Sequence, residues 1–257
     1  TSGSFNCSSI TCNAAKFHLS NWSGTTSNFT SGNISTTSTT GGIKIKNWNA
    51  NNFSAGTITL AQDSFLIDNW DRGSFNCSTM NCGAAKFYVK DWSGTNFICN
   101  SNISTTTGGF KIMNWNGGTF QVSGSISLTQ DSFLIDSWNL GSFSSGAITC
   151  NAAKFHIKDW SGSSFTCNNN ISTSSNFKIR NWTSGSFYSA GSISAAQDTF
   201  LVHGWNGSTF NANNGIICGN ARFQLSNWTA GSFSANSITA NVDSVIVRNW
   251  SAGNFSI

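Results

Sequence analysis

Apolar side chains recur along this chain in one fixed order. One unit consists of Phe143, Ile148, Phe155, Ile157 and Trp160, with spacings of five, seven, two and three residues. Tryptophan closes every unit, at Trp22, Trp48, Trp70, Trp92, Trp115, Trp138, Trp160, Trp182, Trp205, Trp228 and Trp250. From Trp48 onward the intervals between tryptophans differ by at most one position, and only the first interval, from Trp22 to Trp48, is longer. A fixed short period of this kind is typical of one structural unit stacked on copies of itself.

Within a unit, apolar residues alternate with polar ones. Phe155 and Ile157 would point to one side of a strand, and His156 and Lys158 to the other, which is strand patterning. Three strands and three corners fit into about 22 residues and make one coil of a solenoid, with coils about 4.8 Å apart. The sequence therefore predicts an all-β fold, a three-sided β-solenoid (β-helix) of about 11 coils with a single repeat domain over residues 1–257.

The composition agrees with stacked coils and argues against two kinds of partner. The chain contains no proline, and proline would remove ladder hydrogen bonds that most solenoid residues make. Lys and Arg number 13 and acidic residues 9, for a net charge of +4. This charge is too weak and too dispersed to predict nucleic-acid binding. The longest apolar runs are too short to predict a membrane span.

Both ends of the chain fall inside the repeat, and the last residues are Phe255, Ser256 and Ile257. We therefore expect a solenoid that is uncapped at both ends, with exposed backbone donors and acceptors. Such a chain is either a segment of a longer protein or a protomer that stacks head to tail. Stacking of this kind does not close and produces a filament, so the expected partner is a second copy of the chain.

The coils fall into three kinds, and each kind recurs at every third coil. The kinds are marked by Ala-Ala-Lys-Phe at 14–17, 84–87 and 152–155, by Asn-Ile-Ser at 33–35, 102–104 and 170–172, and by Gln-Asp-Ser/Thr-Phe at 62–65, 130–133 and 197–200. Duplication would explain this three-coil period, and so would selection for a surface motif that recurs about every 14 Å, three coil spacings. We favour duplication.

The eight cysteines occupy only two positions of the repeat. One position holds Cys7, Cys77, Cys99 and Cys167, and the other holds Cys12, Cys82, Cys150 and Cys218. Cys82 and Cys99 are separated by less than one period and would lie on neighbouring coils near one corner. The cysteines are candidate disulfide partners, which would imply an oxidising compartment. Equally, they are buried thiols that act as small apolar residues. No Cys-x-x-Cys pair occurs, which argues against a zinc site.

Two columns of outward side chains are predicted when the repeat is folded onto a coil. A hydroxyl ladder follows the central Ile, at Thr11, Ser35, Thr59, Ser104, Ser127, Thr149, Ser172, Ser194 and Thr239. A charge ladder occupies the third strand, at Lys46, Asp68, Lys90, Asp136 and Lys158. Opposite charges on successive strands are mildly favourable. We therefore interpret the charge ladder as a solvated face with ion pairs rather than as a binding site.

The orientation of the tryptophans depends on the residue before them, which is mostly Asn or Asp, as in Asn181-Trp182. Strict alternation from the preceding Phe would point the indole outward, whereas a kink at Asn would turn it into the core. Eleven exposed, stacked indoles would form a large apolar stripe, so we expect them to point inward. An outward stripe would instead be a surface for lateral assembly or for stacking on sugars.

No catalytic constellation stands out in the sequence. Asp63, Asp131, Asp198 and Asp243 recur singly at one position of the repeat, not as the paired carboxylates of a hydrolase. A Ser/His/Asp set, a phosphate loop and a metal motif are also missing. We therefore expect no enzyme activity, no cofactor and no bound metal.

Two segments resemble the repeats of filamentous-haemagglutinin-like adhesins: 145–149, Ser-Gly-Ala-Ile-Thr, and 230–240, Ala-Gly-Ser-Phe-Ser-Ala-Asn-Ser-Ile-Thr-Ala. Those adhesins are secreted bacterial proteins with long right-handed β-helices. The resemblance therefore implies display at the cell surface and adhesion. The recurrent Asn-Trp pair is not part of that family's usual pattern, and no functional residue carries over.

The sequence therefore predicts an extracellular structural or adhesive protein that forms fibres and has no catalytic activity. Its expected partners are further copies of itself and surface glycans. Two alternatives use the same scaffold. Regular hydroxyl ranks, such as Thr57-Ile58-Thr59, can order surface water and would predict ice binding. Outward tryptophans would predict carbohydrate binding.

Overall fold

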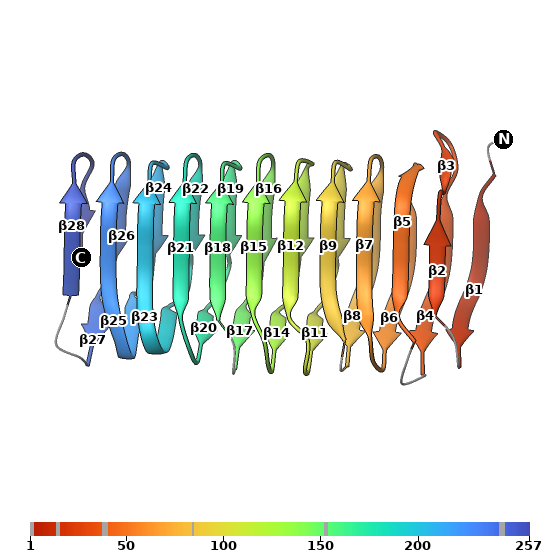
Figure 1. Cartoon of the computed structure of the whole chain (residues 1–257), viewed down its shortest axis with the longest axis horizontal. Helices are drawn as coiled ribbons and strands as arrows, with labels where there is room; N and C mark the ends of the chain where they lie inside the picture. The colour runs from red at the N-terminus through yellow and green to blue at the C-terminus, as the bar shows by residue number, and fades with distance from the viewer. Residues whose placement is uncertain (1–2, 14–15, 38–40, 84, 152–153, 242–244) are drawn as a thin grey trace.

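The chain forms one parallel β-solenoid (Figure 1). The computed structural model describes residues 3–13, 16–37, 41–83, 85–151, 154–241 and 245–257. Strands about 23 residues apart in the sequence lie side by side, and the solenoid has about ten turns. This confirms the predicted all-β solenoid. In the described part of the chain, no helix is long and apolar enough to cross a membrane.

Each coil contributes strands to three faces, which we name after their inward residues. The phenylalanine face contains β1 (Phe5–Cys12), β4 (Phe29–Thr36), β6 (Phe53–Leu60), β8 (Ser74–Cys82), β10 (Asn96–Cys99), β13 (Thr119–Val122), β16 (Ser142–Ser145), β19 (Ser164–Cys167), β22 (Ser186–Ser189), β24 (Thr209–Ala212), β26 (Ser232–Ala235) and β29 (Phe255–Ser256). The isoleucine face contains the second halves of β1, β4, β6 and β8, then β11 (Ile103–Thr105), β14 (Ile126–Leu128), β17 (Ile148–Cys150), β20 (Ile171–Thr173), the first parts of β23 (Ile193–Trp205) and β25 (Ile216–Trp228), and β27 (Ile238–Ala240).

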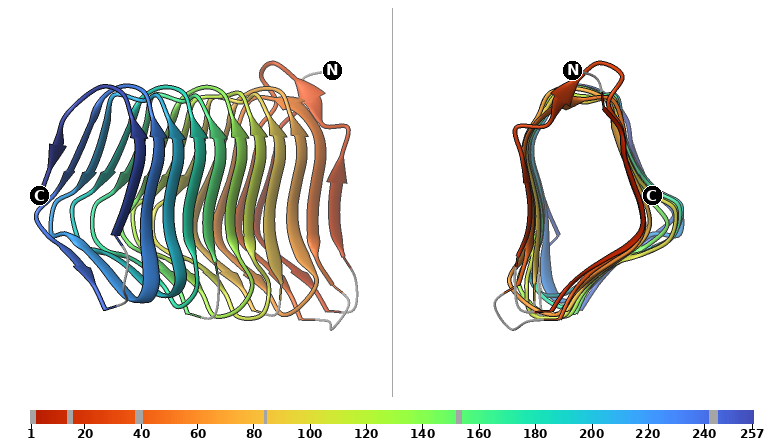
Figure 2. Two further views of the ribbon diagram at one scale, coloured as in Figure 1. Left: turned by 60° about the vertical axis from the view of Figure 1, so that its left-hand side comes forward. Right: turned by 90° about the vertical axis from the view of Figure 1, so that its right-hand side faces the viewer.

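The tryptophan face closes each coil. It contains β2 (Phe17–Ser20), β5 (Ile43–Ala50), β7 (Ser64–Trp70), β9 (Lys86–Trp92), β12 (Phe110–Trp115), β15 (Phe133–Trp138), β18 (Phe155–Trp160), β21 (Phe177–Trp182), the last parts of β23 and β25, and β28 (Val245–Trp250). The short β3 (Ser23–Gly24) pairs with the end of β5. Seen along the stacking axis, the coils superimpose in one outline (Figure 2).

The core consists of columns of apolar residues, and in the columns of Phe at the start of each coil and of Trp at its end each described residue lies on its own kind in the next coil. Phe120 pairs in register with Phe143, and Trp115 with Trp138. Their ring centroids are 5.3 and 4.8 Å apart. The indole of Trp138 also meets the ring of Phe143 edge-on at 6.1 Å. Aromatic pairs of this kind contribute about 0.5–1.5 kcal/mol beyond the area that they bury. The same contacts recur from coil to coil along the stack.

The tryptophans point into the core, as the sequence predicted. Nine of them, from Trp48 to Trp228, have no exposed surface. The residue before each tryptophan has a positive φ, for example 53° at Asn114 and 54° at Asn181. This left-handed angle breaks the strand alternation that would have pointed the indole outward, and Asn and Asp tolerate it better than most residues. The version of carbohydrate binding that needs outward tryptophans is therefore wrong.

The corner after each tryptophan is shaped by the indole. Nε1 of Trp115 donates a hydrogen bond to the carbonyl oxygen of Gly118 at 3.0 Å. Between coils, the indole leaves little room for a side chain, since a Cβ on Gly162 would lie 2.5 Å from Cδ1 of Trp138. Glycine is required there by the close approach of two coils.

Candidate functional site

The outward side chains of the tryptophan face form two columns along the solenoid. Column one contains residues 18, 44, 66, 88, 111, 134, 156, 178, 201, 224 and 246. Column two contains residues 20, 46, 68, 90, 113, 136, 158, 180, 203, 226 and 248. Together they hold eight lysines and arginines but only two aspartates. This face is the candidate binding surface.

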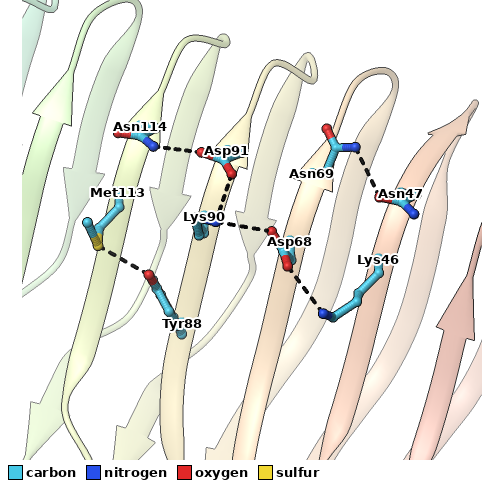
Figure 3. A network of polar contacts seen from close by, with 9 residues as sticks. All are labelled: Lys46, Asn47, Asp68, Asn69, Tyr88, Lys90, Asp91, Met113 and Asn114. Atoms are coloured by element: carbon cyan, nitrogen blue, oxygen red, sulfur yellow. Dashed lines mark hydrogen bonds and ion pairs between the residues drawn. The ribbon is translucent and has the colours of Figure 1, made fainter.

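Column two contains the charge ladder (Figure 3). Asp68 lies between Lys46 and Lys90, and its carboxylate oxygens are 3.4 and 3.7 Å from their Nζ atoms. Asp136 and Lys158 repeat the arrangement, with an oxygen and Nζ 3.5 Å apart. The residues align because parallel, in-register coils place equal repeat positions over one another. The lysines are largely exposed, so solvent screens these ion pairs and they add little to stability.

The residues directly before the tryptophans form a third column at the edge of this face, which we call the asparagine column. It contains residues 21, 47, 69, 91, 114, 137, 159, 181, 204, 227 and 249, all with positive φ. Its side chains bond one another from coil to coil. Nδ2 of Asn47 donates to Oδ1 of Asn21 at 2.7 Å. Where aspartate takes the place of asparagine, as at Asp91, it accepts from Asn114 at 2.6 Å and pairs with Lys90 at 3.1 Å. The column therefore links the corners of some neighbouring coils, and Ser137 and Gly204 interrupt it.

These contacts fix the charge of the acidic side chains at the edge. The hydrogen bond from Asn114, together with the Lys90 ammonium, holds the pKa of Asp91 below its ordinary value of 3.8. The carboxylates of Asp91 and Asp68 raise the pKa of Lys90 in return. The same arrangement lowers the pKa of Asp159 one super-repeat further along. The lowered pKa values keep Asp91 and Asp159 ionised around neutral pH, where they pair with Lys90 and Lys158.

Column one has a three-coil period of its own. A ring, a lysine and a leucine follow one another in three sets: His18, Lys44 and Leu66; Tyr88, Lys111 and Leu134; and His156, Lys178 and Leu201. The lysines of successive sets lie at equal intervals along the sequence. None of the three forms an ion pair with any residue that the structure describes. The Nζ of Lys111 lies 5.3 Å from the centroid of the Tyr88 ring, a cation–π contact.

Two surface hollows flank Tyr88. One, of about 350 Å³, is lined by Tyr88, Lys86, Lys111 and Leu134 among others. The other, of about 500 Å³, is lined by Tyr88, Lys86 and Leu66 among others. Each hollow combines an aromatic ring, an aliphatic wall and at least one cation, and each is also lined by one aspartate, Asp131 in the first and Asp63 in the second. This combination can hold a small ring-shaped group that carries a negative charge.

Sequence reasoning did not single out Tyr88 or Lys111, because it interpreted the charged strands as a solvated face. A signal was present in the equal sequence intervals between Lys44, Lys111 and Lys178. Those intervals give the column and its period. They do not show which lysines have acidic neighbours or where the surface is hollowed, since both depend on side-chain contacts between coils.

The recurring aspartates lie at the corner before the tryptophan face. Asp63, Asp131 and Asp198 have positive φ angles of 73°, 67° and 66°. Asp131 accepts hydrogen bonds from the backbone N and the Oγ of Ser132 at 2.8 and 2.9 Å. Asp243 lies outside the described residues. Within the described ranges, no group of three or more His, Cys or Asp side chains is arranged to hold a metal ion.

The hydroxyl ladder forms one column on the isoleucine face. Its nine residues follow one another in strand register, with Asn81 and Ile217 between them. Neighbouring side chains bond: the Oγ of Ser35 donates to Oγ1 of Thr11 at 3.4 Å, and the Oγ of Ser104 donates to Oδ1 of Asn81 at 3.1 Å. Ile217 is 45% exposed, so the polar rank has one apolar gap.

All eight cysteines are free thiols, and six of them are buried. Cys77 and Cys99 stack in register on the phenylalanine face. The neighbouring thiol lowers the pKa of Cys99 and raises that of Cys77, whose burial raises it further. Burial raises the pKa of Cys150 to about 12. In this structure the cysteines therefore act as small residues of the interior.

No protein-family model matches the chain, and no curated protein and no solved structure matches it significantly. What is shown is a β-solenoid with regular aromatic ladders, and these comparisons identify no family for the chain. The surface chemistry of the solenoid is the basis for assigning a function.

Proposed function

We propose that the protein is a structural and adhesive element of the cell exterior. It is a stiff rod without a catalytic role, and its outer faces bind partners. The observation that carries this proposal is the continuity of the aromatic core. From Trp22 to Trp250 the indoles stack with centroid separations of 4.6 to 5.9 Å. Bending one coil against the next would separate several stacked pairs at once. The resemblance to secreted adhesin repeats supports the location.

We further propose that copies of the chain join end to end into fibres. Each interior coil presents the same kinds of residue to the coil on either side, Phe on Phe and Trp on Trp. A coil of one copy is therefore complementary to a coil of another. A head-to-tail contact of this type does not close, so it generates a filament.

Electron microscopy of native material, together with the intact mass of the polypeptide, tests the structural role. We expect elongated particles of constant width. Antibody labelling of intact, unpermeabilised cells should stain their surface. Compact particles, or staining that requires permeabilised cells, would contradict the proposal.

The hydroxyl ladder supports a second candidate function, ice binding. Hydroxyls repeat about every 4.8 Å along one sheet face, and such a rank can order the water next to it. Thermal hysteresis of the protein solution tests this. If the ladder binds ice, Thr149→Leu should lower the hysteresis and Ile217→Thr should raise it. Ser144→Leu, on the phenylalanine face, should leave it unchanged. A protein without hysteresis would exclude this function.

A further inference from the structure

We propose that the tryptophan face binds a linear acidic polysaccharide, whose sugars carry carboxylate or sulfate groups at intervals. The polysaccharide chain would lie along the solenoid axis, across columns one and two. This inference rests on the adhesive part of the proposed function and names its ligand class.

Charge is the first observation that supports this ligand. Columns one and two hold eight cations and two aspartates, and the asparagine column adds Asp91 and Asp159, which gives these three columns together a net charge of +4. The five remaining cations and five remaining aspartates of the sequence cancel. The strands of the phenylalanine face contain no charged residue. The net charge of these three columns therefore equals that of the whole protein, and an anionic partner is complementary to them.

The second observation is that the cations of column one have no acidic partner among the described residues. In column two, Lys46, Lys90 and Lys158 are held by aspartates 3.4 to 3.7 Å away, whereas Arg180 and Arg248 form no ion pair in the described part of the chain. Lys44 and Lys178, like Lys111, form no ion pair among the described residues. They recur about 14 Å apart, three coil spacings. Their ligand should therefore carry separated negative groups along a line.

The third observation is the surface around Tyr88. The ring of Tyr88 separates two hollows of about 350 and 500 Å³, with Leu134 on one side and Leu66 on the other. A sugar ring has an apolar face that can lie against an aromatic or aliphatic side chain, and hydroxyls that can bond polar neighbours. Asp131 lines the first hollow, Asp63 lines the second, and Lys86 lines both, so hydroxyls of a sugar can bond the carboxylates while its acidic group meets a lysine. The hollows thus offer apolar contact, hydrogen bonding and charge together.

The placement of the aspartates favours a polysaccharide over a nucleic acid. A nucleic-acid strand carries a phosphate about every 3.4 Å. Laid along this face, it would bring phosphates against Asp68 and Asp136, which lie on the coils between the unpaired lysines. A chain with more widely spaced charges can meet Lys44, Lys111 and Lys178 and pass the aspartates with uncharged sugars.

Biolayer interferometry with the immobilised full chain tests the proposal. The probes are polygalacturonate, dextran sulfate, uncharged dextran and single-stranded DNA. We expect binding to polygalacturonate or to dextran sulfate, and the tighter of the two identifies carboxylate or sulfate as the preferred group. Uncharged dextran should bind far more weakly.

Two pairs of variants make the test specific. Lys111→Gln should weaken polysaccharide binding about tenfold, the effect of losing one charged hydrogen bond. Arg72→Gln removes the same charge from the exposed corner after Trp70 and should have little effect. Tyr88→Ala should weaken binding about fivefold through the lost ring contact. Tyr188→Ala removes a tyrosine from β22 of the phenylalanine face and should leave polysaccharide binding unchanged.

The proposal is overturned if none of the polysaccharides binds, or if dextran or DNA binds as tightly as the best acidic polysaccharide. Equal losses in Lys111→Gln and Arg72→Gln would overturn it too, because the effect would then be one of net charge. Electron microscopy of the same preparation separates this result from the structural role. Elongated particles without polysaccharide binding refute the ligand alone, whereas binding by compact particles refutes the rod alone.

Discussion

The asparagine before each tryptophan combines two properties that few residues share. Asn181 has a φ of 54°, and its Nδ2 donates to Oδ1 of Asp159 in the neighbouring coil at 2.7 Å. The left-handed angle turns the next indole inward, and the amide extends the asparagine column. Gly204 and Ser137 occupy the same position in two other coils, also at positive φ. The backbone angle is therefore common to all coils, while the side-chain bond is not.

Asn181→Ala should lower the free energy of unfolding by about 1–3 kcal/mol, since alanine is strained in the left-handed region and loses the hydrogen bond. Asn181→Gly keeps the left-handed angle without strain, so it should lower the free energy of unfolding by less than Asn181→Ala does. Ser137→Asn should raise the free energy of unfolding by roughly 0.5–1 kcal/mol. Urea denaturation measures all three, and equal losses for the alanine and glycine variants would show that the backbone angle is unimportant.

His156 gives the solenoid a pH dependence. Its Nε2 is buried and has no hydrogen-bond partner among the described residues. Burial lowers its pKa, and Arg180 and Lys178 lower it further. A histidine whose pKa is lowered in the folded state binds its proton more readily when unfolded. Stability is therefore full above the unfolded value of about 6.5 and falls as the pH drops below it.

Between pH 7 and pH 5, the His156→Gln variant should lose less folding stability than the natural protein, because the variant lacks the imidazole that titrates in this range. Glutamine fits the position, since Gln224 occupies column one three coils further along. Thermal unfolding at several pH values measures the effect. If the variant and the natural protein lose stability in parallel, His156 is not the responsible group.

Some strands of the solenoid continue through a corner from one face to the next. The sequence predicted a strand, a corner, a second strand, a corner and a third strand. In several coils one strand runs through a corner instead. The ladder continues there, as Gln197 pairs with Asn220 and Asp198 with Ala221 between β23 and β25. Where the corner residues of two coils stay in register, the backbone bonds persist around the bend. A corner is therefore a change of direction and not always a break in the sheet.

Gly162→Ala should lower the free energy of unfolding by about 1–3 kcal/mol, because the new Cβ would overlap the indole of Trp138 and force the coils apart. Gly3→Ala is the matched control, since a Cβ there would have no atom within 4 Å. Denaturant unfolding of both variants checks this. A Gly162→Ala protein as stable as the control would mean that the corner adjusts freely.

The whole molecule is one long stack of aromatic rings inside a polar surface. Interior tryptophans are fully buried, while Trp22 and Trp250 are only partly buried against the core. Charge is distributed unevenly around this stack, since columns one and two and the asparagine column together carry a net charge of +4 and the strands of the phenylalanine face carry none. The molecule thus combines a uniform interior with three chemically different sides.

Tryptophan fluorescence should therefore be blue-shifted and largely resistant to acrylamide, with a minor quenchable component. The quenchable part should come from Trp22 and Trp250, which have no more than one stacked neighbour. The double variant Trp22→Phe and Trp250→Phe should lose that part. Uniform quenching of all eleven tryptophans would contradict the buried stack.

The sequence by itself determined the solenoid, its period and the order of its columns. Lys46, Asp68 and Lys90 could be aligned without coordinates, because parallel coils of nearly equal length place equal repeat positions over one another. The direction of the indoles was decided by a single backbone angle at residues such as Asn181, which pattern alone only suggested. The hollows beside Tyr88 and the unpaired state of Lys111 were decided by tertiary structure alone. They depend on how side chains of three neighbouring coils pack and pair, and a repeat pattern does not contain that information.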